Sequence, residues 1–366
     1  MPAMPRRVLI TGITGFAGSH LAERLVERGH EVHGIAHEAP PFPFLARIAD
    51  RVAIHPADIM DGAAVRRAIA DARPDVVYHL AGQAVPTLAT ADPLGAIRVN
   101  VIGTAHVAEA ASASGAHLVA ASSADVYGMP DRVPSSEDAP LHPTNVYAAT
   151  KVAAEAILRA AGARTRVTIL RPSNQIGPRL HPRLVASEFA KRIAEAEAGV
   201  AELVIRHGQL EPRREFLDVR DMAAAYDSAA DLDDEGSATY NVGSGMTVSV
   251  GEVLEILCRL ARVPIRAELD PERVRPGVPA VLLLDSTRFR ERTSWSPAIP
   301  LERSLSDTLD FWREHVNSRR VRSPGAQTEA PQRTSRTGAP TPEVKPSGPS
   351  EGSFIPPGGT RRTRSE

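Results

Sequence analysis

The feature that most constrains the fold is a glycine-rich turn between a short apolar strand and an amphipathic helix near the N-terminus. The strand covers residues 8–11, the helix ends at Gly29, and the turn reads Gly12-Ile-Thr14-Gly15-Phe16-Ala17-Gly18. Glycines let the backbone turn tightly and approach a pyrophosphate, whose charge is attracted to the helix N-terminus. The spacing is G-x-x-G-x-x-G rather than G-x-G-x-x-G, and a purely structural tight turn is the alternative. We predict that residues 12–18 bind a dinucleotide cofactor.

Short apolar runs alternate with helical patterns over the first 171 residues. The predicted strands cover residues 8–11, 31–35, 52–55, 76–80, 117–121 and 167–171. Apolar strands separated by helices are typical of a parallel sheet with helices on both faces. We therefore predict an α/β fold with a Rossmann-type doubly wound parallel sheet.

After residue 171 this alternation breaks down. The helices predicted there cover residues 184–197, 221–230, 250–261 and 301–316, with a further strand near residues 239–243. We predict an NAD(P)-binding Rossmann domain over residues 1–171, to which residues 215–245 return. Residues 172–214 and 246–318 then form a smaller C-terminal α/β substrate-binding part.

Two strand ends carry candidate ligands for the adenosine half of the cofactor. An acid at the end of the second strand would hold the adenine ribose and favour NAD, but this strand ends in Ala36-His37-Glu38. His37 either faces a 2′-phosphate or is a surface histidine, so the choice between NADPH and NADH stays open, with NADPH slightly favoured. Asp58, followed by Ile59, would accept a hydrogen bond from the adenine amino group. Its alternative role is to cap a helix over residues 62–72.

The next two elements carry candidates for the nicotinamide half. The fourth strand leads into Leu80-Ala81-Gly82, where small residues would let the nicotinamide approach. Asn100 lies on a long, alanine-rich helix predicted over residues 96–114. We predict cofactor contacts at Leu80, Ala81, Gly82 and Asn100.

The segment Asn145-Val-Tyr147-Ala-Ala-Thr-Lys151 places a tyrosine and a lysine four residues apart. On a helix the two side chains lie one turn apart on the same face. A nearby ammonium favours the phenolate, so that a phenol with an ordinary pKa of about 10 can pass its proton at neutral pH. The alternative is an amphipathic helix that carries both residues by chance. Ser123, at the end of the fifth strand, is either a third catalytic residue or a turn hydroxyl.

The glycine turn, Ser123, Tyr147 and Lys151 together resemble the extended short-chain dehydrogenase/reductase family of nucleotide-sugar enzymes. The match covers roughly residues 6–316. The resemblance implies that Ser123 hydrogen-bonds the reacting sugar oxygen and that Tyr147 is the catalytic acid/base. It also implies that Lys151 holds the nicotinamide ribose and lowers the pKa of the tyrosine, with NADPH or NADH as cofactor.

Arginines gather in the later part of the chain. Arg213 and Arg214 lie next to an extended segment, and Arg275 lies in the run Asp270-Pro-Glu-Arg273-Val-Arg275-Pro276. Guanidinium groups suit a diphosphate because it accepts planar, bidentate hydrogen bonds. The alternative for residues 206–221 is a surface of mixed charge, since acids are interspersed there. We predict that Arg214 and Arg275 bind a diphosphate.

The C-terminal segments also resemble one branch of the family, the GDP-4-dehydro-6-deoxy-D-mannose reductases, which form GDP-D-rhamnose. The similar segments are Phe189-Ala-Lys191, Gly208-Gln209-Leu-Glu211 with Arg214, Asp218-Val-Arg-Asp221 and residues 270–276. The resemblance implies a GDP-linked 4-keto-6-deoxy sugar as substrate, whose C4 ketone is reduced. The substrate-binding residues that it implies are Ser123, Asp125, Asn174, Lys191, Gln209, Arg214 and Arg275.

The chain departs from that branch at three places. Gln209 stands where asparagine is usual, and Val278 stands where the family has an acid after an Arg-Pro pair. The segment Arg171-Pro-Ser173-Asn174-Gln175 replaces the family's Arg-Pro-Phe-Asn-His. The last two differences concern contacts to the guanosine ribose and the sugar, not the redox chemistry.

Other functions fit the same scaffold. A nucleotide-sugar 4,6-dehydratase or 4-epimerase would share the fold, but a dehydratase needs an acid/base pair directly after the serine. Here that pair is Ala124-Asp125, which lacks one member and favours simple reduction. A non-catalytic NAD(P)-sensing protein is disfavoured because both Tyr147 and Lys151 are present.

Composition argues against several further classes. The formal net charge of the 366 residues is −1, which argues against general nucleic-acid binding. The single cysteine, Cys258, allows neither an internal disulfide nor a cysteine metal site, and we expect no metal. We find no apolar run of membrane-spanning length and no room for a signal-peptide core. We therefore expect a cytoplasmic protein without membrane contact.

Residues 319–366 differ in composition from the rest. Pro, Gly, Ser and Thr fill more than half of this tail, and nine basic against four acidic residues give it a net charge of +5. Such a segment cannot bury enough surface to offset its ordering entropy, so we predict a disordered tail. Elsewhere, the alanine-rich helices at 96–114 and 145–161 are predicted to form a homodimer interface, as in the resembled family. The alternative is that both belong to the core of one chain.

Overall fold

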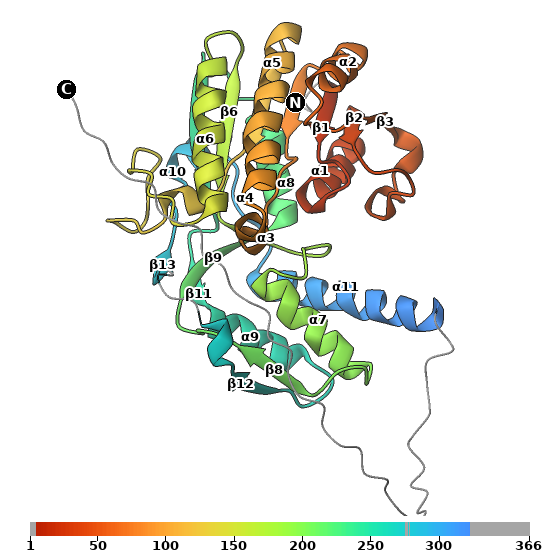
Figure 1. The fold of residues 1–366 in the computed structure, drawn as a ribbon, viewed down its shortest axis with the longest axis vertical. Helices are drawn as coiled ribbons and strands as arrows, with labels where there is room; N and C mark the ends of the chain where they lie inside the picture. Colours follow the sequence, from red (N-terminus) through yellow and green to blue (C-terminus); the bar gives the residue numbers. More distant parts are fainter. Residues whose placement is uncertain (1–4, 275–276, 278, 323–366) are drawn as a thin grey trace, which may run out of the picture. The chain divides into compact units, whose positions relative to one another are not determined.

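The computed structural model describes residues 5–274, 277 and 279–322. The chain up to Arg322 forms one compact unit, built around a seven-stranded sheet (Figure 1). In spatial order its strands are β10 (Ser237–Val242), β6 (Val167–Pro172), β5 (His117–Ala121), β4 (Val76–His79), β1 (Arg7–Thr11), β2 (Glu31–Ala36) and β3 (Val52–Pro56). All neighbouring pairs run parallel, so the predicted parallel sheet is confirmed.

Helices cover both faces of this sheet because its strands are apolar on both sides. On β1, Val8 and Ile10 join one core, whereas Leu9, which points to the opposite face, joins the other. The first core is completed by α1 (Phe16–Glu27) and α8 (Val219–Ala229). The second is completed by α2 (Gly62–Ala72), α5 (Thr104–Ser114) and α6 (Val146–Ala161). The sheet is therefore doubly wound.

The helix predicted over residues 96–114 is interrupted, which corrects that prediction. It consists of α4 (Pro93–Ile97), a π-helical turn η3 (Arg98–Gly103) and α5. The cause is Asn100, whose side chain is almost fully buried and bonds outside the helix. Its Oδ1 accepts from the backbone N–H of Gln83 at 2.7 Å, and its Nδ2 donates to the carbonyl of Gln83 at 3.1 Å and to Thr150 at 2.9 Å. The wider turn thus directs Asn100 toward the end of β4, and such turns are frequent at functional sites.

A smaller C-terminal part packs around its own apolar core. Its helices are α7 (Val185–Glu197), α9 (Val250–Leu260) and α11 (Leu301–Arg322), which lie together in Figure 1. One set of strands is β9 (Arg213–Asp218), paired with β7 (Asn174–Ile176), β11 (Thr247–Ser249) and β13 (Val281–Leu282); the other is β8 (Val204–His207) with β12 (Arg266–Leu269). The remaining elements are α3 (Pro86–Ala91), α10 (Thr287–Thr293) and the short turns η1 (Pro43–Leu45), η2 (Ala49–Arg51), η4 (Ala124–Tyr127) and η5 (Pro271–Arg273).

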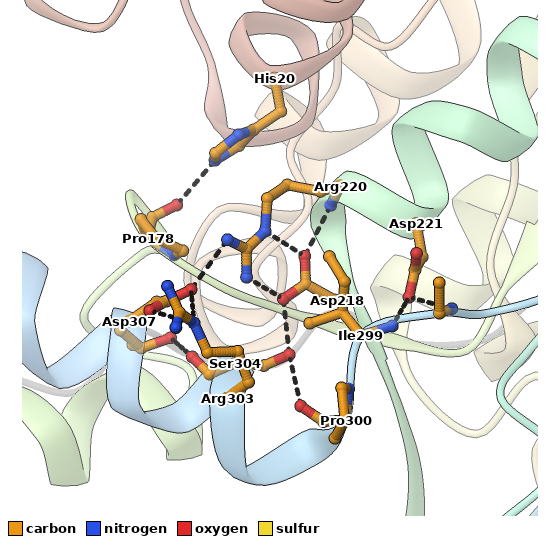
Figure 2. A network of polar contacts seen from close by, with 12 residues as sticks. His20, Pro178, Asp218, Arg220, Asp221, Ile299, Pro300, Arg303, Ser304 and Asp307 are labelled. Carbon is orange, nitrogen blue, oxygen red and sulfur yellow. Dashed lines mark hydrogen bonds and ion pairs between the residues drawn. The ribbon is translucent and has the colours of Figure 1, made fainter.

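A network of charged groups joins the C-terminal helix to the rest of the fold (Figure 2). Asp218 ends β9, caps α8 through the N–H of Arg220, and receives the hydroxyl of Ser304 from α11. The Arg220 guanidinium bonds both oxygens of Asp218, at 2.8 and 2.7 Å, and pairs with Asp307 at 2.8 Å. The neighbouring Asp221 accepts two backbone N–H groups from the segment before α11. In this segment, Asp218 and Asp221 are therefore structural anchors and do not belong to a mixed-charge surface.

The helix α11 runs to Arg322, so the predicted start of the disordered tail at residue 319 is wrong by four residues. The rest of that tail, residues 323–366, lies outside the described residues. Among the helices that are described, none combines the length and apolar character needed to cross a membrane.

Candidate active site

The glycine turn leaves β1 and enters α1 in a shape that excludes side chains. Gly12 adopts a φ of +72°, and a Cβ there would lie 2.8 Å from the backbone of Ala81. A Cβ on Gly18 would collide with the carbonyl oxygen of Gly12. Gly15 precedes α1 without a side-chain cap, so the first backbone N–H groups of the helix remain for an anion. The turn that contains Thr14, Phe16 and Ala17 therefore fits a pyrophosphate.

The ends of β2 and β3 lie beside this turn. Glu38 accepts a hydrogen bond from the Thr14 hydroxyl at 3.0 Å, which brings a carboxylate to the place where the sequence indicated none. His37 is exposed, and its Nδ1 lies 3.7 Å from the Glu38 carboxylate. The alternative role of Asp58 as a helix cap is wrong, because Asp61 caps α2 and Asp58 accepts from the N–H of Met60. The adjacent Ile59 is buried in the core between β3 and α5.

The ends of β1 and β4 meet where the nicotinamide half was predicted. Leu80 donates its backbone N–H to the carbonyl of Thr11 at 3.2 Å, and the next N–H, of Ala81, is 3.2 Å from the Thr11 hydroxyl. A Cβ on Gly82 would lie 2.9 Å from Oδ1 of Asn100 and 3.7 Å from Nζ of Lys151. The structure thus brings Gly82, Asn100 and Lys151 together.

Ser123, Tyr147 and Lys151 converge at the carboxyl end of β5. The Tyr147 hydroxyl is hydrogen-bonded with Ser123, which also accepts from the N–H of Asp125 at 3.1 Å. Lys151 donates its Nζ to the carbonyl of Ala121 at 2.8 Å. Ser123, Asp125 and Tyr147 line a cavity of about 190 Å³, together with Asn174 from β7.

Burial dominates the electrostatics of these groups. It raises the pKa of Tyr147, which the carboxylate of Asp125 raises further and the bond with Ser123 lowers. It lowers the pKa of Lys151 to about 8, against the opposing effect of Glu155. The predicted depression of the tyrosine pKa by Lys151 is therefore not found, since desolvation outweighs any nearby ammonium. At neutral pH the phenol keeps its proton, which is the state that a proton donor requires.

Arg214 faces Asp125 across a second cavity of about 560 Å³, which Asn174 also lines. Burial raises the pKa of Asp125, and the charge of Arg214 opposes that rise. The Arg214 guanidinium donates to the backbone carbonyls of Arg213 and Pro279, at 2.8 and 2.9 Å. The Asn174 side chain donates to the carbonyl of Glu215 at 3.2 Å. Arg214 and Asn174 are thus fixed in position by β9 and its neighbours.

The remaining predicted substrate ligands lie farther out. Lys191 and Gln209 line a wide groove of about 1060 Å³ that continues from Arg214. Lys191 forms an ion pair with Glu195 at 2.5 Å. Arg275 lies outside the described residues, as does Val278. The nearby Arg273 pairs with Glu188 at 2.7 Å and lines the same groove.

Two further features were not predicted from the sequence. Ser173 Oγ and Gln175 Oε1 are buried without a hydrogen-bond partner among the described residues, and both residues line the cavity of Ser123 and Tyr147. Glu155, which is fully buried, lies one helical turn beyond Lys151. The departure from the family's Arg-Pro-Phe-Asn-His segment was a signal for the first pair. The four-residue spacing from Lys151 was a signal for Glu155.

The sequence and the fold are similar to those of known proteins. The model of the NAD dependent epimerase/dehydratase family matches residues 8–243. The GDP-6-deoxy-D-mannose reductase of Pseudomonas aeruginosa is 31% identical over 319 residues, which cover 86% of this chain and 99% of that protein. The UDP-glucose 4-epimerase of Mycolicibacterium smegmatis is 32% identical over 314 residues, covering 84% of this chain and 98% of that protein.

A solved structure of RMD from Pseudomonas aeruginosa, complexed with NADPH, has a TM-score of 0.73 and 29% sequence identity. The similarity covers 85% of this chain and 99% of that chain. The fold and the nicotinamide cofactor that the sequence predicted are thereby confirmed, and so is the enzymatic nature of the chain. The glycine turn, Ser123 and the Tyr147/Lys151 pair all lie within the residues that the family model matches. The chain belongs to the NAD dependent epimerase/dehydratase family.

Proposed function

We propose that this protein reduces the C4 ketone of GDP-4-dehydro-6-deoxy-D-mannose to GDP-D-rhamnose, with NADPH or NADH as reductant. The observation that carries the proposal is the Tyr147 hydroxyl, hydrogen-bonded to Ser123 in a cavity that Asp125 and Asn174 also line. The identity with a GDP-6-deoxy-D-mannose reductase supports this substrate class. In this proposal residues 1–171 and 215–245 hold the cofactor, and residues 172–214 and 246–318 hold the substrate.

The residues present fit a dinucleotide cofactor. The backbone N–H groups of residues 16–18 would bind its pyrophosphate, and Asp58 would accept from the adenine amino group. Glu38 would accept from the ribose hydroxyls, whereas His37 would pair with a 2′-phosphate, so both NADH and NADPH are compatible with this strand end. Bound there, a reduced nicotinamide supplies the hydride for the reaction.

The catalytic residues would transfer the proton and orient the sugar. Ser123 would donate a hydrogen bond to the C4 oxygen, and Tyr147 would pass its phenolic proton to that oxygen as the ketone becomes an alcohol. Lys151 would bind the nicotinamide ribose, with Leu80, Ala81, Gly82 and Asn100 shaping the space for the ring. One reduced cofactor and one proton are consumed per sugar.

The substrate would extend from this cavity into the outer groove. Asp125 and Asn174 would contact the sugar, and Arg214 would bind the diphosphate as a planar, charged donor. Lys191 and Gln209 would lie along the nucleotide. Arg275 remains the predicted second ligand of the diphosphate.

A second candidate is 4-epimerisation of a nucleotide sugar, which the identity with a UDP-glucose 4-epimerase supports. An epimerase or a dehydratase regenerates its cofactor, whereas a reductase consumes it. The residue after Ser123 is alanine, so one member of a dehydratase's acid/base pair is missing. That absence favours reduction over dehydration.

The test follows the absorbance of reduced nicotinamide with GDP-4-dehydro-6-deoxy-D-mannose as substrate. Loss of one NADPH or NADH per sugar supports the proposal. Interconversion of UDP-glucose and UDP-galactose without net cofactor loss would support the epimerase instead. Tight cofactor binding with neither reaction would point to a sensing protein. A thermal-shift panel of GDP, UDP, dTDP and CDP, each with NADPH or NADH, identifies the base.

We also propose a homodimer through the helices at 96–114 and 145–161. Three large apolar side chains are exposed on α4 and the π-helical turn: Leu94 is 66%, Ile97 42% and Ile102 45% exposed. A second copy of the chain, packing the same helices against these, would remove this apolar surface from water.

A further inference from the structure

Glu155 is a buried carboxylate near the proposed catalytic residues, and it has no role in the proposed reaction. Glu155 follows Lys151 by four residues on α6, and its side chain is fully buried. It accepts from Arg171 on β6 at 2.9 and 2.7 Å, and from the hydroxyl of Ser122, the residue after β5, at 2.5 Å. Arg159, one turn further along α6, adds a bond at 2.6 Å.

These bonds tie the helix of Tyr147 and Lys151 to the strands beneath it. Ser122 immediately precedes Ser123, and the carbonyl that Lys151 binds belongs to the residue before Ser122. Arg171 also donates to the Tyr127 hydroxyl at 2.7 Å, and Tyr127 donates in turn to Asn241 on β10 at 2.7 Å. The Glu155 carboxylate is thus the point where α6, β5 and β6 meet, one helical turn from Lys151.

A stabilising role does not explain why such a pair is buried. Desolvating two charges often costs as much as their attraction returns, and apolar replacements of buried pairs are often neutral. A negative charge beside a buried ammonium has a different effect, because it favours the charged form of that ammonium.

Ionisable groups around Lys151 and Tyr147 come from five elements: Glu155 on α6, His79 on β4, Asp125 on η4, Arg171 on β6 and Tyr226 on α8. Burial lowers the pKa of His79 to about 3, so it is neutral near pH 7. The charge of Asp125 raises the pKa of Tyr147. Among these groups Glu155 is the one that raises the pKa of Lys151, against the burial that brings it to about 8.

We propose that Glu155 is a positioning residue that keeps Lys151 charged and fixed against β5 for binding the nicotinamide ribose. The inference rests on the ribose-binding role proposed for Lys151. Because the charged form of Lys151 binds the ribose hydroxyls, cofactor affinity should weaken as pH rises through the pKa of this lysine. Removal of the Glu155 charge should then move that midpoint to lower pH.

The experiment measures NADPH binding by fluorescence between pH 6 and pH 10 for the full chain, without sugar. In the Glu155→Gln variant the alkaline midpoint should fall by about one pH unit. The matched control is Arg159→Met, which removes an exposed partner of the same carboxylate but leaves its charge. In Arg159→Met the alkaline midpoint of NADPH affinity should stay in place or move slightly to higher pH.

Loss of one partner of a buried pair leaves the other charge buried without compensation, so Glu155→Gln can fail to fold. The double variant Glu155→Met, Arg171→Met removes both charges and should show a smaller downward shift, because loss of the Arg171 cation acts in the opposite direction. An unchanged midpoint in a folded variant without the Glu155 charge overturns the proposal, as does a wild-type affinity that is independent of pH. Since no sugar is present, a failure to reduce the GDP-linked ketone counts against the proposed reaction and leaves this measurement intact.

Discussion

The Tyr147 phenol owes its protonated state to its surroundings. Its side chain is 7% exposed, and both burial and the Asp125 carboxylate raise its pKa. A phenol in this state cannot act as a base at neutral pH, but it can donate to an oxygen on which negative charge develops. The direction of the proposed reaction, from ketone to alcohol, agrees with this state.

Replacement of Tyr147 by phenylalanine should therefore lower the turnover of keto-sugar reduction by about 10²- to 10⁴-fold. The affinity for GDP should stay within twofold, because the phenol lies away from the groove of Arg214. Turnover is measured by nicotinamide absorbance and GDP affinity by calorimetry.

Tyr78→Phe is the matched control. Tyr78 is a buried tyrosine in the core of the central sheet, and it lines neither the cavity of Ser123 and Tyr147 nor the one beside it. Loss of the Tyr78 hydroxyl should leave turnover unchanged. Equal losses of turnover and GDP affinity in Tyr147→Phe would contradict the assignment of Tyr147 as proton donor.

Ser173 and Gln175 add polar atoms to the cavity wall. A buried polar atom without a partner costs about 1–3 kcal/mol, which a ligand hydroxyl would recover. We predict that Ser173→Ala and Gln175→Leu each raise the KM for the keto sugar about tenfold, with NADPH affinity unchanged. Steady-state kinetics with each substrate varied in turn measures this.

The control for Ser173→Ala is Ser286→Ala. The Ser286 hydroxyl is also buried without a described partner, but it lies at the start of α10 and lines neither the Ser123 cavity nor the one beside it. The Ser286→Ala variant should leave the KM for the keto sugar and the KM for NADPH unchanged. If all these variants behave alike, the cavity position of Ser173 and Gln175 has no bearing on sugar recognition.

At the scale of the elements, the long apolar strands and amphipathic helices were predictable from periodicity. The six predicted strands of the first 171 residues match β1 to β6 to within one or two residues. The strands β7, β8, β9, β11, β12 and β13 were not predicted as strands. They are two to six residues long and rich in polar groups, so their pairing depends on distant neighbours and not on local pattern. The π-helical turn was missed because a tertiary bond network around Asn100 causes it.

Two strands of the central sheet carry buried histidines. His79 on β4 lies between the hydroxyls of Thr11 and Thr104, at 2.8 and 2.9 Å, and His117 on β5 contacts Thr168 at 2.9 Å. Burial lowers the pKa of His79 to about 3 and that of His117 to about 4. The unfolded chain binds protons below about pH 6.5 that these histidines cannot accept in the fold.

The free energy of unfolding should therefore decrease as pH falls from about 6.5 toward 4, by about 1.4 kcal/mol per pH unit for each histidine. Stability that is present above pH 6.5 is lost on acidification. The variant His117→Gln, which retains a polar partner for Thr168, should show a shallower slope in urea unfolding at several pH values. His37→Gln, at an exposed site, should show the wild-type slope, and an equal slope in all three proteins would rule this explanation out.

At the scale of the whole molecule, the site is assembled from segments far apart in sequence. Asp125, Asn174 and Arg214 line one cavity although they come from η4, β7 and β9. Family likeness indicated Asp125 and Asn174, and the gathering of arginines also indicated Arg214, but no spacing rule connects the three residues. By contrast, Tyr147 and Lys151 belong to one helix, so their proximity was predictable from the helical periodicity. The cavity volumes and the burial that sets the pKa values followed only from the structure.

The exposed apolar residues of α4 and the π-helical turn predict the assembly state. The variant Ile102→Glu should convert a dimer into monomers of 39.1 kDa, because a carboxylate would be buried in the interface. Light scattering coupled to size exclusion measures the mass. Leu269→Glu changes a residue that is 63% exposed on β12 and should leave the mass unchanged. A wild-type chain that is monomeric at all concentrations would refute the interface.

Strand β9 presents residues alternately to two sides, and its register decides the sign of the charge at the substrate cavity. Arg214 and Phe216 line the cavities, while Glu215 points the other way and accepts the N–H groups of Gly245 and Leu284 at 2.6 and 3.0 Å. A shift of one residue in the register of β9 would place the Glu215 carboxylate where the Arg214 guanidinium lies. Such a chain would lack the cation at the cavity, so the two amide bonds to Glu215 help to fix the charge that a ligand meets there.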